Sequence, residues 1–124
     1  MVGYQSIPTI VSFHYTNYKY MLNTIKKIFG FGPQINYAEL VKQGAIIVDV
    51  RSKNEFAGGH ISGAINIAVD QLSNNLSKLS NKKTTIITCC ASGMRSAAAK
   101  NILKNNGYQD VYNGGSWRSL QNKI

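Results

Sequence analysis

Two adjacent cysteines, Cys89 and Cys90, stand just before a short segment that ends in an arginine, Cys90-Ala-Ser-Gly-Met-Arg95. A strand-like apolar run precedes them and an alanine-rich helical segment follows. A thiol at the start of a helix and near a guanidinium is favoured as the thiolate. Gly93 lets the segment curl so that backbone N–H groups point inward and form a cradle for anions. Such a thiolate suits two chemistries: sulfur transfer from an anionic donor, and attack on a phosphate ester.

The choice between these chemistries depends on which cysteine begins the loop. Cys89 gives the spacing Cys-x5-Arg of cysteine-dependent phosphatases, whereas Cys90 gives the shorter Cys-x4-Arg of sulfurtransferases. Cys89 continues a β-branched run, so we expect it to be a buried small hydrophobe, with a second reading as a thiol that resolves a persulfide. Thr88 stands where phosphatases usually have a histidine, and a shorter ring leaves room for one sulfur rather than a phosphate. The sequence therefore favours Cys90 and sulfur transfer, with a phosphatase or arsenate reductase as the alternative.

The elements that must position this loop alternate between strands and helices, which predicts an α/β domain with a mainly parallel central sheet flanked by helices. Ligands of such folds bind beyond the carboxyl ends of the strands, where the loop lies. The hydrophobic pattern and the breakers predict a helix over 37–43, a strand over 45–50, a helical turn over 54–57, a strand over 64–68, a helix capped by Asp70 that runs through Leu79, a strand over 84–89, a helix over 96–105, a strand over 110–112 that Gly114-Gly115 follow, and a terminal helix from about Ser116.

The domain boundaries follow from a change in pattern near the start of the chain. Residues 1–20 are rich in Tyr, Ser and Thr and have no period, which predicts a poorly patterned extension. Residues 21–32 form a short amphipathic helix in this reading, suited to packing on the domain, and 33–124 form the domain itself. No run is long enough to span a bilayer, and no signal peptide is evident, so we expect a cytoplasmic protein.

The composition bounds the partners of the protein. The chain has 124 residues, 14 Lys and Arg against 5 Asp and Glu, and a formal charge of +9. This charge attracts anions of every kind, but the lysines are scattered and the arginines few, so we expect no nucleic-acid partner. Neighbouring cysteines exclude a disulfide scaffold. His14 and His60 are far apart in the sequence, so no metal set can be assembled, and we predict no cofactor.

The chain resembles the rhodanese family in several ordered motifs that together cover about residues 35–120. These motifs are Asp49-Val-Arg51, Glu55-Phe56, the segment Gly59-His-Ile-Ser-Gly-Ala-Ile-Asn-Ile67, the loop Cys90-Ala-Ser-Gly-Met-Arg-Ser96, and Gly107-Tyr108 through Gly114-Gly115 with Trp117 beyond. Two positions depart from the family pattern. Ala68 replaces a usual proline, and Trp117 follows the paired glycines early; both departures leave the loop intact.

The resemblance implies a single rhodanese-like domain and a thiosulfate sulfurtransferase. Cys90 would be the nucleophile that becomes a persulfide, and Arg95 with the loop backbone would hold an anionic sulfur donor. The substrate-binding positions carried over are Ala91, Ser92, Gly93, Met94, Arg95 and Ser96, and the supporting polar network is Asp49, Arg51, Glu55 and His60. The acceptor would be cyanide, a small thiol or a protein, and the chain a monomer or weak dimer.

Several residues also have a structural interpretation. His60 is expected to be a hydrogen-bonding residue of a turn rather than a base, Ser96 is a candidate helix cap, and the paired glycines serve backbone geometry. Rhodanese-like domains also occur as interaction modules, generally where the cysteine has been lost. Cys90 and Arg95 are both present, which favours an enzyme over an inert module.

Overall fold

The computed structural model describes residues 34–124. Their core is a four-stranded sheet in the order β2-β1-β3-β4, in which every neighbouring pair is parallel. The predicted α/β class is therefore confirmed. The elements in chain order are α2 (Tyr37–Lys42), β1 (Ile46–Asp49), α3 (Lys53–Ala57), β2 (Ile65–Asn66), the 3₁₀ segments η1 (Val69–Asn74) and η2 (Leu76–Leu79), β3 (Ile86–Cys90), α4 (Met94–Asn105), β4 (Val111–Ser116) and α5 (Trp117–Gln121).

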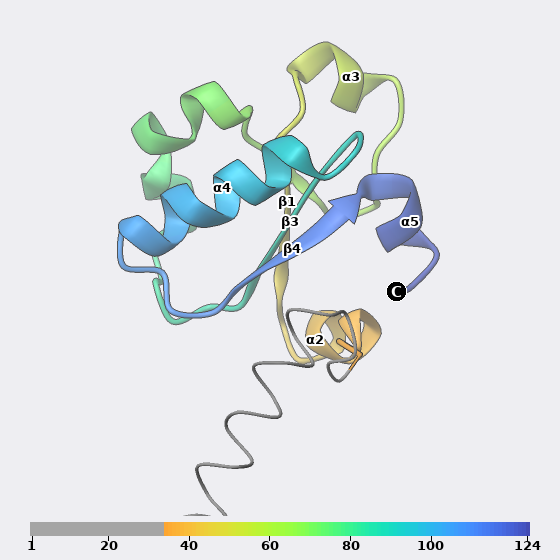
Figure 1. Ribbon diagram of the computed structural model, residues 1–124, viewed down its shortest axis with the longest axis horizontal. Helices are drawn as coiled ribbons and strands as arrows, with labels where there is room; N and C mark the ends of the chain where they lie inside the picture. The colour runs from red at the N-terminus through yellow and green to blue at the C-terminus, as the bar shows by residue number, and fades with distance from the viewer. Residues whose placement is uncertain (1–33) are drawn as a thin grey trace, which may run out of the picture. The chain divides into compact units, whose positions relative to one another are not determined.

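Helical segments cover both faces of the sheet (Figure 1). One face packs against α4 and the two 3₁₀ segments through buried side chains that include Val48, Ile86 and Leu103. The opposite face packs against α2 and α5 through Ile47, Ile87 and Leu120. Because successive side chains of a strand point to opposite faces, each central strand contributes to both cores. This explains why β1 and β3 read as continuous apolar runs.

Helix α3 lies at the end of the sheet to which the β4 arrow points (Figure 1). Ser52 begins α3 with a reciprocal capping box, in which its hydroxyl accepts the Glu55 N–H and the Glu55 carboxylate accepts the Ser52 N–H. The Ser-x-x-Glu pattern in the sequence is a signal for this helix start. The cap fixes the start of α3 beyond the end of β1, and it orients Glu55 in the first turn.

The segment after β2 differs from its prediction. The helix that Asp70 was expected to cap is absent, and two 3₁₀ turns, η1 and η2, replace it. Ala68 precedes η1 without a side-chain cap, so the prediction for Asp70 is wrong. Asn74 ends η1 and Asn75 separates the two turns, and asparagine favours local hydrogen bonds over helix interiors. The apolar residues Leu72 and Leu79 are still buried, so the pattern indicated burial correctly but not the helix type.

The start of α4 and the end of β4 also differ from their predictions. Helix α4 begins at Met94 rather than Ser96, because Gly93 occupies the N-cap with a φ of 106°, a conformation that favours glycine. Ser96 is therefore inside the helix, and its predicted capping role is wrong. Strand β4 continues to Ser116, so the paired glycines lie within it. Gly114 is required there because a Cβ would stand 2.9 Å from Ile87 Cγ2, Leu120 Cδ2 and the Thr88 carbonyl oxygen.

The predicted extension over residues 1–20 and the predicted amphipathic helix over 21–32 lie outside the described residues. Within 34–124, none of the helices is both long and apolar enough to cross a bilayer.

Candidate active site

The Cys90 side chain lies at the end of β3, on the face that packs against α4. Only Ala91, Ser92 and Gly93 separate the strand from the helix, so the loop is tight. The Gly93 N–H donates to Cys90 Sγ at 2.9 Å, and the Ser96 hydroxyl lies 3.5 Å from the same sulfur. The sulfur therefore sits under the first turn of α4, where the positive end of a helix favours a negative charge.

The surroundings of Cys90 lower its pKa below the ordinary thiol value. Burial of the residue acts in the opposite direction and disfavours the charge. It is outweighed by the hydrogen bond with the Ser96 hydroxyl and by hydrogen bonds from the backbone N–H groups of Ser96, Gly93 and Ser92. Hydrogen bonds to the charged form stabilise that form, so this arrangement favours a thiolate. Backbone N–H groups thus point toward Cys90 Sγ, as predicted from the sequence.

Cys89 has the opposite orientation. Its side chain belongs to the core on the α2 and α5 face, next to Ile87 and Leu120. Burial and the nearby Asp49 carboxylate raise the pKa of the Cys89 thiol to about 12. In the register of the sheet, Cys89 pairs with Asp49 across β1 and β3. The side chain is thus a neutral, buried thiol directed away from the loop.

Asn113 joins the loop to strand β4, and sequence reasoning missed it. The Ser96 hydroxyl donates to Asn113 Oδ1 at 2.6 Å, and the Gly115 N–H donates to the same oxygen at 2.9 Å. Asn113 Nδ2 donates to the Gly93 carbonyl at 3.3 Å, so the amide contacts the end of the loop and the first turn of α4. An isolated asparagine between an apolar strand and two glycines reads as a turn residue. Its role depends on the pairing of β3 with β4, which the local pattern does not give.

Arg95 forms an ion pair with Glu55 across 40 residues of sequence. Its guanidinium donates to both carboxylate oxygens, at 2.7 and 2.9 Å, while each side chain remains 38% exposed. The hydrogen bond from Arg95 lowers the pKa of the Glu55 carboxyl to about 2. Arg95 was predicted to hold an anionic donor. The structure places the Arg95 guanidinium beside the loop, where it is hydrogen-bonded to the Glu55 carboxylate. The positive charge of Arg95 is therefore largely neutralised locally.

A second, buried ion pair fixes the segment after β1. Arg51 donates to Asp49 with Nη2–Oδ2 at 2.7 Å, and the same nitrogen donates to the Gly59 carbonyl at 2.7 Å. Asn66 Nδ2 donates to the backbone carbonyls of Asp49 and Arg51 at 3.0 and 2.9 Å. These contacts tie Gly59, which follows α3, and Asn66, in β2, to the end of β1. They form a polar framework that surrounds the approach to the loop.

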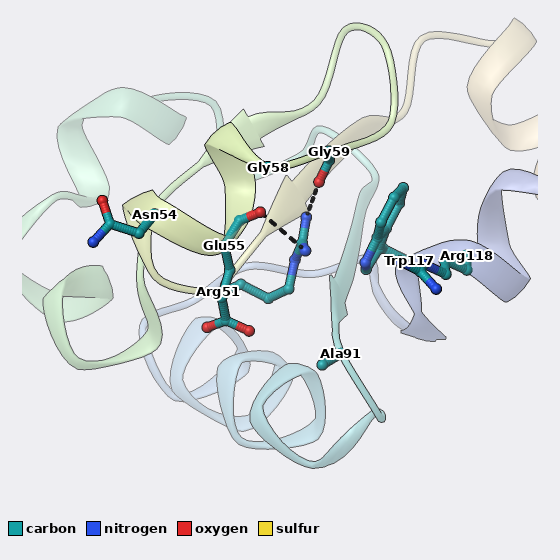
Figure 2. Close-up of a pocket in the computed structure, with 8 residues that line it drawn as sticks. All are labelled: Arg51, Asn54, Glu55, Gly58, Gly59, Ala91, Trp117 and Arg118. Atoms are coloured by element: carbon teal, nitrogen blue, oxygen red, sulfur yellow. Dashed lines mark hydrogen bonds between the residues drawn. The ribbon is translucent and has the colours of Figure 1, made fainter.

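A pocket of about 440 Å³ opens next to the loop, between α3 and α5 (Figure 2). Figure 2 shows Arg51 and Glu55 on one side, Trp117 on the other, and Ala91 at the end of β3 between them. The Arg51 guanidinium lies 4.7 Å from the centre of the Trp117 ring, and that of Arg118 lies 5.3 Å from it. The lining residues are Arg51, Asn54, Glu55, Gly58, Gly59, Ala91, Trp117 and Arg118.

The remaining predicted site residues have different positions. Ala91 lines the pocket and Ser92 contributes a backbone N–H to the sulfur. Met94 is 82% exposed, so its side chain points into solvent and the first helical turn uses only its backbone. His60 Nδ1 lies 2.8 Å from the Phe56 carbonyl, and its ring stacks on Phe56. His60 is thus exposed and neither contacts Cys90 nor lines the pocket, which matches its structural interpretation.

No group of three or more His, Cys, Asp or Glu side chains comes together within residues 34–124 in a way that would hold a metal ion.

Comparison with known proteins agrees with this geometry. A family model described as "Rhodanese-like domain" matches residues 34–122. A structure of a rhodanese with anions from E. coli superposes with a TM-score of 0.59 at 30% identity, and covers 61% of this chain and 91% of that one. A human single-domain sulfurtransferase has a TM-score of 0.58 at 27% identity, over 70% and 90% of the two chains.

Curated relatives include proteins with and without an assigned activity. The uncharacterized protein YqhL of Bacillus subtilis is 39% identical over 69 residues, which are 56% of this chain and 54% of the relative. Thiosulfate sulfurtransferase PspE of Escherichia coli is 31% identical over 74 residues, 59% and 71% of the two chains. The chain spans about half the length of YqhL and of YibN of Escherichia coli. On the family match, the site and the fold together, this chain belongs to the rhodanese-like domain family, a family of sulfurtransferase type.

Proposed function

We propose that this protein is a sulfurtransferase that carries sulfur as a persulfide on Cys90. The observation that carries the proposal is the position of Cys90 Sγ, which accepts a 2.9 Å hydrogen bond from the Gly93 N–H under the first turn of α4. Relatives named thiosulfate sulfurtransferase support thiosulfate as the donor. Cyanide, a small thiol or a protein thiol is the acceptor class. The lowered pKa of Cys90 supports attack as a thiolate.

The loading step is a displacement at the outer, sulfane sulfur of thiosulfate. The Cys90 thiolate attacks that sulfur, the sulfur–sulfur bond of thiosulfate breaks, and sulfite leaves with the bonding electron pair. The product is a persulfide whose terminal sulfur bears the negative charge. Backbone N–H groups of Ser92, Gly93 and Ser96 surround Cys90 Sγ, the atom to which this terminal sulfur is bonded. No further oxidant or reductant is needed, because the donor supplies the sulfur at the required oxidation level.

The discharge step returns Cys90 to its starting state. Cyanide or an acceptor thiolate attacks the terminal sulfur of the persulfide, and the bond between that sulfur and Cys90 Sγ breaks. Thiocyanate or an acceptor persulfide leaves, and the electron pair remains on Cys90 as the thiolate. The hydrogen bonds that lower the pKa of Cys90 also make it a better leaving group.

Arg95 supports the loop in this proposal mainly by its position. Its pairing with Glu55 fixes the guanidinium beside the first turn of α4. An incoming dianion has to compete for this guanidinium with Glu55, whose lowered pKa of about 2 keeps the carboxylate ionised. The phosphatase alternative needs Cys89 as the nucleophile. Cys89 is buried on the opposite face with a pKa raised to about 12, so the alternative lacks support from the geometry.

The test is the intact mass of the protein after thiosulfate treatment. Wild type and Cys89→Ser are expected to gain the mass of one sulfur, and Cys90→Ser is expected to gain none. Addition of cyanide should remove the extra sulfur from both loaded proteins and release an equal amount of thiocyanate. The matched serine variants at neighbouring positions control for nonspecific oxidation.

Other results would assign a different function. Retention of the added sulfur in Cys90→Ser would overturn the proposal. Hydrolysis of an aryl phosphate that depends on Cys89 would point to a phosphatase. Absence of sulfur uptake by a folded wild type would point to an interaction module.

A further inference from the structure

The Ser96 hydroxyl has one hydrogen and more acceptors around it than that hydrogen can serve. Its oxygen lies 2.6 Å from Asn113 Oδ1, 3.0 Å from the Gly93 carbonyl oxygen and 3.5 Å from Cys90 Sγ. The Gly93 carbonyl already accepts from the Ala97 N–H at 3.1 Å and from Asn113 Nδ2 at 3.3 Å, which uses both of its lone pairs. The Ser96 hydrogen is therefore shared between Asn113 Oδ1 and the sulfur.

The protonation of Cys90 decides where this hydrogen points. As a thiol, Cys90 donates its S–H to the Ser96 oxygen, and the Ser96 hydroxyl donates to Asn113 Oδ1. As a thiolate, Cys90 has no hydrogen to donate, and a hydrogen bond from the Ser96 hydroxyl then stabilises its charge. The Gly115 N–H donates to Asn113 Oδ1 at 2.9 Å in either case, so the amide oxygen keeps a partner when the hydroxyl turns to the sulfur.

We infer that Asn113 is a positioning residue that controls the charge on Cys90 by competing with the sulfur for the Ser96 hydrogen. Its consequence for sulfur transfer rests on the proposed function. In the persulfide, the negative charge lies on the terminal sulfur, and Cys90 Sγ no longer requires the hydroxyl. The Ser96 hydrogen then returns to Asn113 Oδ1. Asn113 thus favours the thiol and the persulfide over the empty thiolate.

The other titratable groups around Cys90 have partners or positions that do not involve residue 113. They are Arg95 on α4, paired with Glu55; Asp49 on β1, paired with Arg51; Cys89 on β3 and Tyr112 on β4, both in the core on the α2 and α5 face; and Tyr108 before β4, whose hydroxyl donates to the carbonyls of Leu76 and Leu79. A change in the titration of Cys90 on substitution of Asn113 therefore reports the Ser96 hydrogen.

The first test is the pH midpoint of iodoacetamide labelling of Cys90, measured in a Cys89→Ser background. Asn113→Leu removes the competing acceptor and keeps the size of the side chain, so the Ser96 hydrogen should turn to the sulfur. The midpoint should fall by about 0.5–1 pH unit, the effect of one hydrogen bond. Asn113→Ala, which adds no apolar bulk, should shift it in the same direction. Asn101→Leu, at an exposed position of α4, is the matched control and should leave it unchanged.

The sign of this shift separates positioning from a structural role. If Asn113 only tied β4 to α4, its loss would loosen the loop, withdraw donors from the sulfur and raise the midpoint. Ser96 keeps an anchor without Asn113, because the Thr88 hydroxyl donates to the Ser96 carbonyl at 2.8 Å. In the Ser96→Ala background, Asn113→Leu should leave the midpoint where Ser96→Ala alone puts it. A full downward shift without the hydroxyl would overturn the competition.

The second test measures the loaded state itself. Protein is equilibrated with thiosulfate and sulfite at fixed ratios, above the labelling midpoints of both proteins, and the loaded fraction is read from the intact mass. Asn113→Leu should lower the equilibrium constant for loading by about three- to tenfold, because it stabilises the thiolate relative to the persulfide. An unchanged equilibrium constant would overturn the role of Asn113 in the persulfide state.

The outcomes separate this inference from the proposed function. An unchanged or higher labelling midpoint in both Asn113→Leu and Asn113→Ala would overturn the inference, whether or not the protein transfers sulfur. If wild type does not load with thiosulfate, the proposed function is wrong, and the labelling midpoints alone decide whether Asn113 acts on Cys90.

Discussion

Cys89 and Cys90 are neighbours in one strand, and both are fully buried, yet the sheet gives them different surroundings. Cys90 faces α4, where a hydroxyl and several backbone N–H groups surround its sulfur. Cys89 faces α2 and α5, where aliphatic side chains and the Asp49 carboxylate surround it. The alternation of side chains along a strand therefore separates a candidate nucleophile from a core residue within one peptide unit.

The difference between the two thiols comes from hydrogen bonds rather than from exposure. Burial alone raises the pKa of both thiols. Only Cys90 has donors that stabilise the charged sulfur, and they outweigh its burial. A buried cysteine is thus no evidence against reactivity when its sulfur receives N–H groups from a tight loop. Measurements on each thiol separately test this difference.

The largest expected difference is in thiolate reactivity, measured on the single-cysteine variants Cys89→Ser and Cys90→Ser. The pKa of Cys89 is about 12, whereas that of Cys90 lies below the ordinary 9.0, a gap of more than three pKa units. At neutral pH this gap makes the thiolate fraction of Cys90 about a thousandfold larger than that of Cys89. A thiolate of lower pKa is also a weaker nucleophile, which reduces the expected difference in rate by about thirtyfold. Iodoacetamide should therefore label Cys90 at least about thirtyfold faster than Cys89.

The pH dependence of labelling carries the same sign. The rate for Cys90 should level off at a lower pH than that of an ordinary thiol, because its pKa is lowered. The rate for Cys89 should continue to rise toward pH 12, because its pKa is raised. Similar rates and similar midpoints in the two variants would remove the distinction that the loop is argued to create. Guanidinium-unfolded protein, in which both thiols titrate ordinarily, provides the reference.

The second largest expected effect is on stability. Cys89→Ser should lose more stability than Cys90→Ser, whereas activity should be lost only in Cys90→Ser. In Cys89→Ser a hydroxyl replaces a thiol among Ile47, Ile87 and Leu120, which should lower the free energy of unfolding by about 1–3 kcal/mol. In Cys90→Ser the new hydroxyl has the Gly93 N–H and the Ser96 hydroxyl as partners, so the loss should stay below about 1 kcal/mol. Urea denaturation with equal slopes measures both values. A larger loss for Cys90→Ser would place the greater structural role at Cys90.

The sequence predicted the fold well where the pattern is local. The apolar runs of β1 and β3 indicated buried parallel strands, and their order placed the loop at the carboxyl edge of the sheet. The Asp70 helix failed because burial of Leu72 and Leu79 is compatible with two 3₁₀ turns as well as with a helix. Periodicity reports which side chains are buried, and the backbone type then depends on propensity and neighbours.

The different surroundings of the two cysteines could be predicted from the sequence, and their hydrogen-bond partners less so. Cys89 was assigned to the β-branched strand and Cys90 to the loop, and the structure places their side chains in two separate cores. The contacts of Asn113 and the pairing of Arg95 with Glu55 join residues 17 to 40 positions apart. The pairing of Arg95 with Glu55 could have been predicted, because β1 and β3 are adjacent and the segments that follow them meet at one end of the sheet. Asn113 needed the register of β3 with β4, which sequence patterns do not give.

The smallest expected effect isolates one hydrogen bond of the loop. Ser96→Ala removes the hydroxyl that contributes most among the donors lowering the pKa of Cys90, and the backbone N–H groups remain. The pKa of Cys90 should therefore rise, and labelling and thiosulfate loading at pH 7 should slow by about three- to tenfold. Ser73→Ala, an exposed serine in η1, is the matched control and should leave the labelling rate of Cys90 unchanged. If Ser96→Ala leaves the labelling midpoint of Cys90 where it was, the backbone N–H groups and the first turn of α4 account for the contrast between the two cysteines. In that case the Ser96 hydroxyl serves Asn113, at 2.6 Å, rather than the sulfur.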